Sequence, residues 1–237
     1  MNMRPGALLR TDRDRYYRGY SRPDNIEFFD DFLGDLIEDG WNVAADTGGT
    51  ANCGVAASGG VCTITNDTSD NDVTSIAHEL NWYPNKSCYF ETRLKIDVVT
   101  TLGFCVGFSD AKSEAGSTLP WELSVVTYTT TGTDGFGFLF DVDATTDTIR
   151  CVGVKTDVDG THLDSAIVPV AGTYITLACG ITPGETASYW IDNVLIGTVA
   201  LASAAAVALT PYIGIKNQGG AAHVASIDYV YCAQSRT

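Results

Sequence analysis

Apolar and polar side chains alternate with a period of two through most of the chain after residue 26. The clearest case is the stretch CYFETRLKIDVV (88–99), in which residues 89, 91, 93 and 95 alternate with Phe90, Thr92, Leu94 and Ile96. Successive side chains of a β-strand point to opposite faces of its sheet, so this pattern predicts a strand with one buried face and one face in water. The pattern therefore favours a β-sheet protein.

Further stretches of the same kind follow, and glycine, aspartate, asparagine, threonine or proline residues separate them. TLGFCVGFSDA (101–111) is almost continuously apolar, as expected for a strand in the middle of a sandwich. Two stretches stay open: IEFFDDFLGD (26–35) suits a short helix or a strand, and LASAAAVAL (201–209) suits a helical turn or a loop. Short strands without a long amphipathic helix predict an all-β fold, an antiparallel two-sheet sandwich.

The first 25 residues differ from the rest in charge and pattern. They contain six arginines and three aspartates, a charge of +3, and the whole chain has a formal charge of −15, so residues 26–237 carry −18. We therefore predict an extended basic and aromatic arm (1–25) followed by a sandwich domain (26–237). A disordered tail is the alternative. Arginine and tyrosine are enriched at binding surfaces, so we assign partner binding to Arg10, Arg13, Arg15, Tyr16, Tyr17, Arg18, Tyr20 and Arg22.

Charge and hydropathy exclude several classes of partner. The acidic domain disfavours nucleic acid and anionic membranes, which bind clustered cations. The chain has no apolar run near the roughly 18 residues of a membrane helix, and Ala7–Leu9 is too short for a secretory signal, so we expect a protein made and used without export. Its seven cysteines lack zinc spacing, so we expect buried, reduced thiols, with Cys53–Cys62 as the one local pairing to test.

Several stretches together resemble a known fold family: residues 89–111, then FGFLFDVDATTDTIRCVGVK (136–155), residues 173–200 and residues 211–232. They look like the concanavalin A-like (laminin-G-like) jelly roll, over about Phe28–Cys232. In this pattern YWIDNVLIG (189–197) forms a hairpin with Asp192 and Asn193 at its turn, where these residue types tolerate left-handed backbone angles. The sequence looks most like structural proteins of tailed bacteriophages, which include capsid decoration proteins and tail components.

The catalytic pattern of the glycosidases with this fold is absent. They carry E-x-D-x-x-E on one strand, and in the nearest match, KIDVVT (95–100), Asp97 remains while Lys95 and Thr100 replace the glutamates. His78, His162 and His223 are widely spaced. The acidic stretches 141–147 and 157–164 are either turns in water or calcium loops. We therefore predict no enzyme activity, no catalytic residue, no cofactor and no metal.

The resemblance favours a capsid decoration (cement) protein on the surface of the virion, made in the host cytoplasm. Its partners would be the major capsid protein and neighbouring copies of itself, as a homotrimer, held through the arm and subunit contacts. The alternative is a lectin-like carbohydrate-binding module of a tail fibre or virion surface that binds host glycans. Sugar sites combine exposed aromatic rings with polar groups, and Trp82, Tyr83, Trp121 and Tyr128 are the candidates, although core positions explain them more simply.

Overall fold

The computed structural model describes residues 25–33, 40–53, 60–113, 118–160, 162–200 and 202–236. All eight arm residues assigned to partner binding lie outside the described residues. Within the described residues, no helix is long and apolar enough to cross a membrane.

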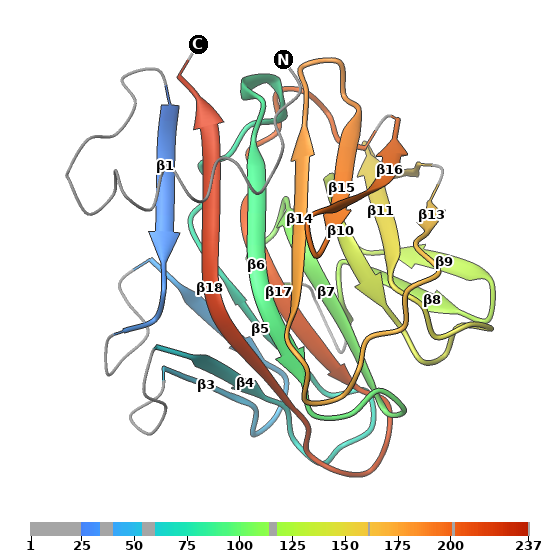
Figure 1. The fold of residues 1–237 in the computed structure, drawn as a ribbon. Coiled ribbons are helices and arrows are strands. Elements are labelled where there is room, and N and C mark those ends of the chain that lie inside the picture. Colours follow the sequence, from blue (N-terminus) through green and yellow to red (C-terminus); the bar gives the residue numbers. More distant parts are fainter. Residues whose placement is uncertain are drawn as a thin grey trace.

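Eight antiparallel strands form the sheet that faces the viewer in Figure 1, called the front sheet below. Its path is β16-β15-β14-β6-β18-β4-β3, and β1 pairs with β18 beyond the end of β4. The twelve-residue strand β18 pairs with β1, β4 and β6, so it holds three parts of the sheet together. The strands of the front sheet are β1 (Asn25–Asp30), β3 (Thr50–Cys53), β4 (Cys62–Thr65), β6 (Tyr89–Ile96), β14 (Ile175–Ile181), β15 (Ala187–Ile191), β16 (Val194–Val199) and β18 (Val224–Ser235).

Eight further strands form the back sheet, with the path β12-β11-β10-β7-β17-β5-β2 and β13 paired to β11. Sequence neighbours in this sheet are often not spatial neighbours: β17 lies between β7 and β5. Its strands are β2 (Asn42–Ala45), β5 (Val73–Ala77), β7 (Leu102–Ser109), β10 (Gly135–Phe140), β11 (Arg150–Lys155), β12 (Val158–Asp159), β13 (Leu163–Asp164) and β17 (Thr210–Asn217). A single 3₁₀ turn, Pro84–Lys86, precedes β6 in the described part of the chain.

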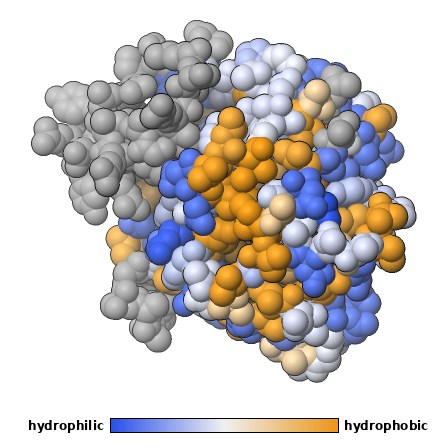
Figure 2. Space-filling model, turned by 45° about the vertical axis from the view of Figure 1, so that its right-hand side comes forward, coloured by the Kyte–Doolittle hydropathy of each residue, from blue (hydrophilic) through white to orange (hydrophobic). Residues whose placement is uncertain are grey.

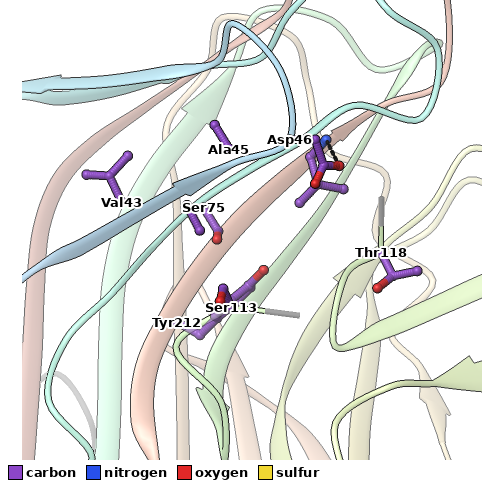
Figure 3. Close-up of a pocket in the computed structure, with 9 residues that line it drawn as sticks. Val43, Ala45, Asp46, Ser75, Ser113, Thr118 and Tyr212 are labelled. Atoms are coloured by element: carbon purple, nitrogen blue, oxygen red, sulfur yellow. Dashed lines mark hydrogen bonds between the residues drawn. The ribbon is translucent and has the colours of Figure 1, made fainter. Parts of the chain in front are cut away.

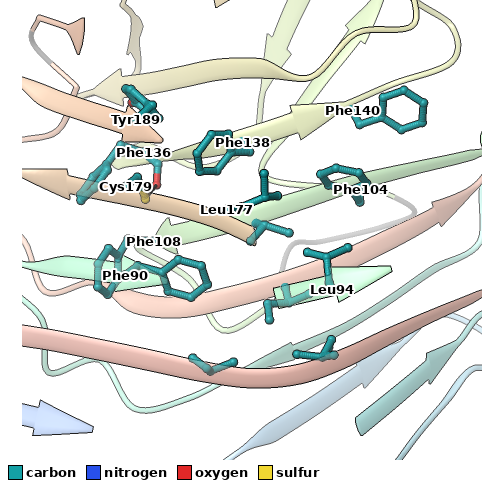
Figure 4. Packing of buried hydrophobic residues seen from close by; sticks show 14 of the residues in the cluster. Phe90, Leu94, Phe104, Phe108, Phe136, Phe138, Phe140, Leu177, Cys179 and Tyr189 are labelled. Atoms are coloured by element: carbon teal, nitrogen blue, oxygen red, sulfur yellow. Dashed lines mark hydrogen bonds between the residues drawn. The ribbon is translucent and has the colours of Figure 1, made fainter. Parts of the chain in front are cut away.

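Aromatic and aliphatic side chains from the inner faces of both sheets fill the space between them (Figure 4). Phe90 of β6 meets Phe108 of β7 with ring centroids 5.7 Å apart, and Phe138 of β10 meets Tyr189 of β15 at 5.5 Å. The Tyr189 hydroxyl donates a 2.6 Å hydrogen bond to the backbone carbonyl of Val152. The one polar atom of this buried ring is therefore satisfied, as burial requires.

A hairpin forms a third layer over the outer face of the back sheet. It consists of β8 (Trp121–Ser124) and β9 (Thr127–Thr130), which pair only with each other among the named strands. Trp121 and Leu123 are buried in a second apolar cluster with outward-facing residues of the back sheet. This layer explains why every residue of β7 is buried, on both faces of its strand.

The predicted fold class is confirmed: the chain is all-β, with two large antiparallel sheets in a sandwich. Of the two open stretches, the first begins with residues 26–30 of strand β1, and the described part of 201–209 contains no helix. The predicted hairpin turn is present, since Asp192 and Asn193 have φ angles of +48° and +66° between β15 and β16. The sequence did not reveal the third layer, because its strands alternate like those of either sheet.

Apolar residues also gather on one outside surface, seen near the middle of Figure 2. Exposed valines and a leucine come from the β13–β14 connection and the start of β16: Val168, Val170, Val194 and Leu195. Leu163 packs directly against Gly197, so the β13 region lies against β16. Leu195 pairs with Trp190 of β15, so this surface continues onto the outer face of the front sheet.

Candidate functional site

A hollow of about 290 Å³ lies at the β2 edge of the back sheet (Figure 3). Residues of β2, β5 and β17 and of the connection from β7 to β8 enclose it. Its lining residues are Val43, Ala44, Ala45, Asp46, Val73, Ser75, Ser113, Thr118 and Tyr212. A cavity of this size is at the lower end of small-ligand sites, which usually measure about 300–1,000 Å³.

The ring of Tyr212 lies along β17 above Gly214, at the bottom of the hollow. A Cβ on Gly214 would come within 2.8 Å of the Tyr212 ring and hydroxyl and 2.9 Å of Leu119 Cδ2. Glycine at 214 therefore allows the Tyr212 ring to lie against β17, and the Leu119 side chain also packs onto Gly214. The shape of the hollow depends on this close approach.

Asp46 supplies the carboxylate of the hollow and follows directly after β2. Its backbone N–H donates to the Val73 carbonyl at 3.1 Å, and its Oδ2 accepts from the Val73 N–H at 3.3 Å. The neighbouring Asp72 accepts from the Thr47 N–H, the Thr47 hydroxyl and the Asp67 N–H at 2.8–3.1 Å. These bonds fix the end of β2 against β5 and hold the Asp46 side chain in place.

The chemistry of the lining suits a ligand with many hydroxyl groups. Ser75, Ser113 and Thr118 contribute hydroxyls that both donate and accept, and Asp46 contributes an acceptor. Hydrolysis of a glycosidic bond normally uses a pair of carboxylates, and Asp46 is the one carboxylate among the described residues of the lining. As described, the hollow can bind such a ligand through hydrogen bonds.

The outer face of the front sheet carries a second group of polar and aromatic residues, called the Glu91 face below. Glu91 of β6 is fully buried, although its strand pattern places it on the outside. Its carboxylate accepts hydrogen bonds from the hydroxyls of Tyr89 at 2.6 Å and Tyr229 at 2.5 Å. Burial and the Glu91 charge raise the pKa of Tyr89 far above its ordinary value. The prediction that this side of β6 is wet is therefore wrong at Glu91.

Of the residues considered for catalysis, Asp97 and His223 lie together, whereas His78 and His162 have other neighbours. Asp97 faces His223, with Oδ2 and Nδ1 3.7 Å apart, and His223 Nε2 is 2.8 Å from the Thr101 hydroxyl. His78 packs between the rings of Phe28 and Trp41 at 4.4 and 5.2 Å. Burial lowers the pKa of His78 and likewise that of His162, whose ring stacks on Tyr128 at 3.7 Å.

The acidic stretches considered for calcium have structural partners. Asp141 is buried and accepts from the N–H groups of Leu123 and Asp143 and from the Gln218 side chain, at 2.6–3.1 Å. Asp164 pairs with Arg150 at 2.6 Å, and its pKa is lowered by hydrogen bonds and by the Arg150 charge, against the effect of burial. Within the described ranges, no three potential ligands gather closely enough to hold a metal ion.

Two of the four aromatic residues considered for sugar stacking are in the core. Trp82 packs against Phe108 at 6.0 Å, and Trp121 of β8 packs onto the outer face of the back sheet; both are buried. Tyr83 and Tyr128 are partly exposed on separate parts of the surface. The hollow itself has no sequence motif, because its residues come from four separate stretches. The one local signal is the spacing of Tyr212 and Gly214 on one strand face.

No protein-family model and no curated protein matches the sequence. Solved structures do match the fold. The Emp47p carbohydrate recognition domain has a TM-score of 0.61 and 11% identity, over 91% of this chain and 99% of that one. A glycoside hydrolase family 16 endo-glucanase from Bacteroides ovatus has a TM-score of 0.58 and 13% identity, over 86% and 98%. A β-1,3-glucanase from Mycobacterium marinum has a TM-score of 0.58 and 12% identity, over 86% and 97%.

These structures confirm the concanavalin A-like jelly roll. They contradict the prediction that the chain is not an enzyme, because endo-glucanases and a transglycosylase are among the proteins that share its architecture. That prediction relied on the missing E-x-D-x-x-E pattern and on the wide spacing of the three histidines. At 11–13% identity an active site need not keep the same residues on the same strand, so the missing pattern does not exclude activity.

Proposed function

We propose that this protein recognises a glycan, and that the hollow beside Asp46 is the place where a sugar unit binds. The observation that carries the proposal is the lining itself: three hydroxyl side chains and one oriented carboxylate above the Tyr212 ring. A sugar replaces the hydrogen bonds of bound water with its own hydroxyls, so a polar hollow of this size suits it better than an apolar ligand.

The fold neighbours support this proposal over a capsid role. One is a carbohydrate recognition domain, and others are glucanases, including one solved with the product of a mixed-linkage glucan. We therefore take β-glucan oligosaccharides as the first ligands to test. This choice rests on the shared fold, and the hollow provides the independent reason to look for sugar binding.

Calorimetric titration of the full chain with β-1,3-, β-1,4- and mixed-linkage gluco-oligosaccharides tests the proposal. We expect saturable binding by at least one of them, and a loss of roughly tenfold or more in affinity for Asp46→Ala, since a hydrogen bond to a charged group contributes about 1.5–3 kcal/mol. The control is Asp70→Ala, which removes an exposed carboxylate outside the lining. Equal affinities for wild type and Asp46→Ala would place any binding elsewhere.

The same mixtures decide between binding and turnover. After incubation, chromatography of the oligosaccharides would show either the intact ligand or shorter products. Intact ligand with saturable binding supports a recognition module. Shorter products that disappear in the Asp46→Ala protein would instead make the hollow an active site, with a second carboxylate to be found by substitution.

A role in a bacteriophage virion, as a decoration protein or as a fibre module, rests on the sequence resemblance and the arm composition. The fold neighbours named above give no support to the capsid, to the major capsid protein as a partner, or to a homotrimer. We keep this role as the second candidate because the segment with Arg10 to Arg22 is unlike the acidic remainder. Its test is binding to expanded capsids that lack the protein, with and without residues 1–25.

A further inference from the structure

One row of side chains crosses the outer face of the front sheet from β1 to β15. Strand register places Phe29 beside Tyr231, Tyr231 beside Glu91, Glu91 beside Ala178, and Ala178 beside Trp190. Neighbouring strands lie about 4.8 Å apart, so the row extends roughly 19 Å. It has a carboxylate in its middle and aromatic rings toward both ends.

Neighbouring rows extend the aromatic surface around Glu91. The ring of Phe29 lies 5.9 Å from that of Tyr229, and the ring of Tyr89 lies 6.1 Å from Tyr231 and 6.3 Å from Trp190. Tyr229 and Tyr231 are nearly buried, whereas Tyr89 and Trp190 are partly exposed. Glu91 thus lies among rings, and the Arg93–Asp228 ion pair lies on the next row of the same face.

The chemistry of this face matches a guanidinium group. Two tyrosine hydroxyls already bond the Glu91 carboxylate, and a carboxylate held among rings can also accept a bidentate pair from an arginine. Arginine also stacks on aromatic rings, which ammonium groups do less well. The same sheet already shows this contact: Arg93 lies over the ring of Tyr174 at 4.3 Å and pairs with Asp228 at 2.8 Å.

We propose that the Glu91 face binds the arginine- and tyrosine-rich segment 10–22 of the same chain. That segment carries five of the six arginines of the +3 arm, while residues 26–237 carry −18. Its connection leads to Asn25, the first residue of β1, which pairs with Ser235 at the edge of this face. At about 3.3 Å per residue the segment can reach the whole row, and such a short tether gives a millimolar effective concentration.

Hydrogen–deuterium exchange of the full chain tests this proposal. We expect the amides of residues 10–22 to exchange more slowly than in the isolated peptide. Glu91→Gln keeps the shape of the side chain and removes its charge. It should speed exchange of these amides by about tenfold or more, the factor for losing one charged hydrogen bond. The amides of β6 and β18 should keep their protection.

Two further variants serve as a control and as a second test of the segment. Glu79→Gln makes the same change at an exposed glutamate that pairs with Lys112, and it should leave the segment unaffected. If Glu91→Gln does not fold, the triple change Arg13→Gln, Arg15→Gln and Arg18→Gln alters the segment only and should raise its exchange alike. Equal exchange of the segment in wild type and in the folded variants would overturn the proposal. Protection that appears only at concentrations where a dimer forms would also overturn it, because the segment would then bind a second copy.

Discussion

At the residue scale, buried ionisable side chains couple the stability of the sandwich to alkaline pH. Desolvation raises the pKa of the thiols of Cys88, Cys179 and Cys232, and burial together with Asp164 raises the pKa of Cys151 to about 12. Desolvation likewise raises the pKa of Tyr189. In each case the folded state holds the proton more tightly than the unfolded chain does.

We therefore expect the melting temperature to fall as the pH rises above about 8.5, the ordinary cysteine pKa. The sign follows from proton linkage: the contribution of each thiol is complete below the unfolded pKa and is lost as the pH rises toward the folded pKa. Melting curves between pH 6 and 11 measure this. Cys151→Ala should have a shallower alkaline slope than wild type. A slope unchanged by this substitution would exclude Cys151 as a source of the effect.

A second residue-scale prediction concerns the bottom of the hollow. Gly214→Ala places a methyl group 2.8 Å from Tyr212 and 2.9 Å from Leu119, so one of them must move. Overpacking of this kind costs about 1–3 kcal/mol. Urea unfolding should show that loss, and the proposed glycan binding should weaken with it. The control is Gly220→Ala, because nothing lies within 4 Å of a methyl group at that position; equal midpoints for the two variants would contradict the packing described for Tyr212.

At the element scale, the buried carboxylate of Asp141 helps to attach the β8–β9 layer to the back sheet. Asp141 accepts from the Leu123 N–H of β8 and from Gln218, which follows β17. The turn of the hairpin is held to the same region, since the Val125 N–H donates to the Asp143 carbonyl at 2.7 Å. The layer is thus attached to the sheet by hydrogen bonds as well as by Trp121 and Leu123.

Asp141→Asn should loosen this layer without unfolding the sandwich. The charge is lost and an amide NH₂ replaces one acceptor, which we expect to cost about 1–3 kcal/mol. Hydrogen exchange should rise for the amides of 121–130 and stay unchanged for those of β6. Asp70→Asn, at an exposed position, serves as the control. Uniform exchange changes throughout both sheets would show that the layer unfolds only together with them.

The strands were predictable because apolar and polar residues alternate where one face of a strand is buried, as in β6 and the first half of β18. The third layer was not, since alternation in residues 121–130 gives no information on which sheet a strand covers. The burial of Glu91 was also unpredictable, because it depends on Tyr89 of its own strand and Tyr229 on a strand far away in the sequence. The hollow was missed for the same reason: its carboxylate, hydroxyls and ring come from distant stretches.

At the scale of the whole molecule, one core joins both sheets, so we expect a single unfolding transition. Trp82 lies in that core, while Trp121 lies in the outer layer. Far-ultraviolet circular dichroism and tryptophan fluorescence should therefore give coincident urea curves with one midpoint. A separate early fluorescence change, absent from Trp121→Phe, would mean that the outer layer unfolds before the sandwich.

The pairing of β1 with β18 also has a consequence during translation. Strand β1 is synthesised early, but it can pair with β18 only after residues 230–235 have been added. Ribosomes add roughly 5–20 residues each second. The edge of β6 that β18 later covers stays open for much of that interval. An unpaired strand edge can pair with another chain, so the nascent protein is open to such pairing at β6 until β18 has formed.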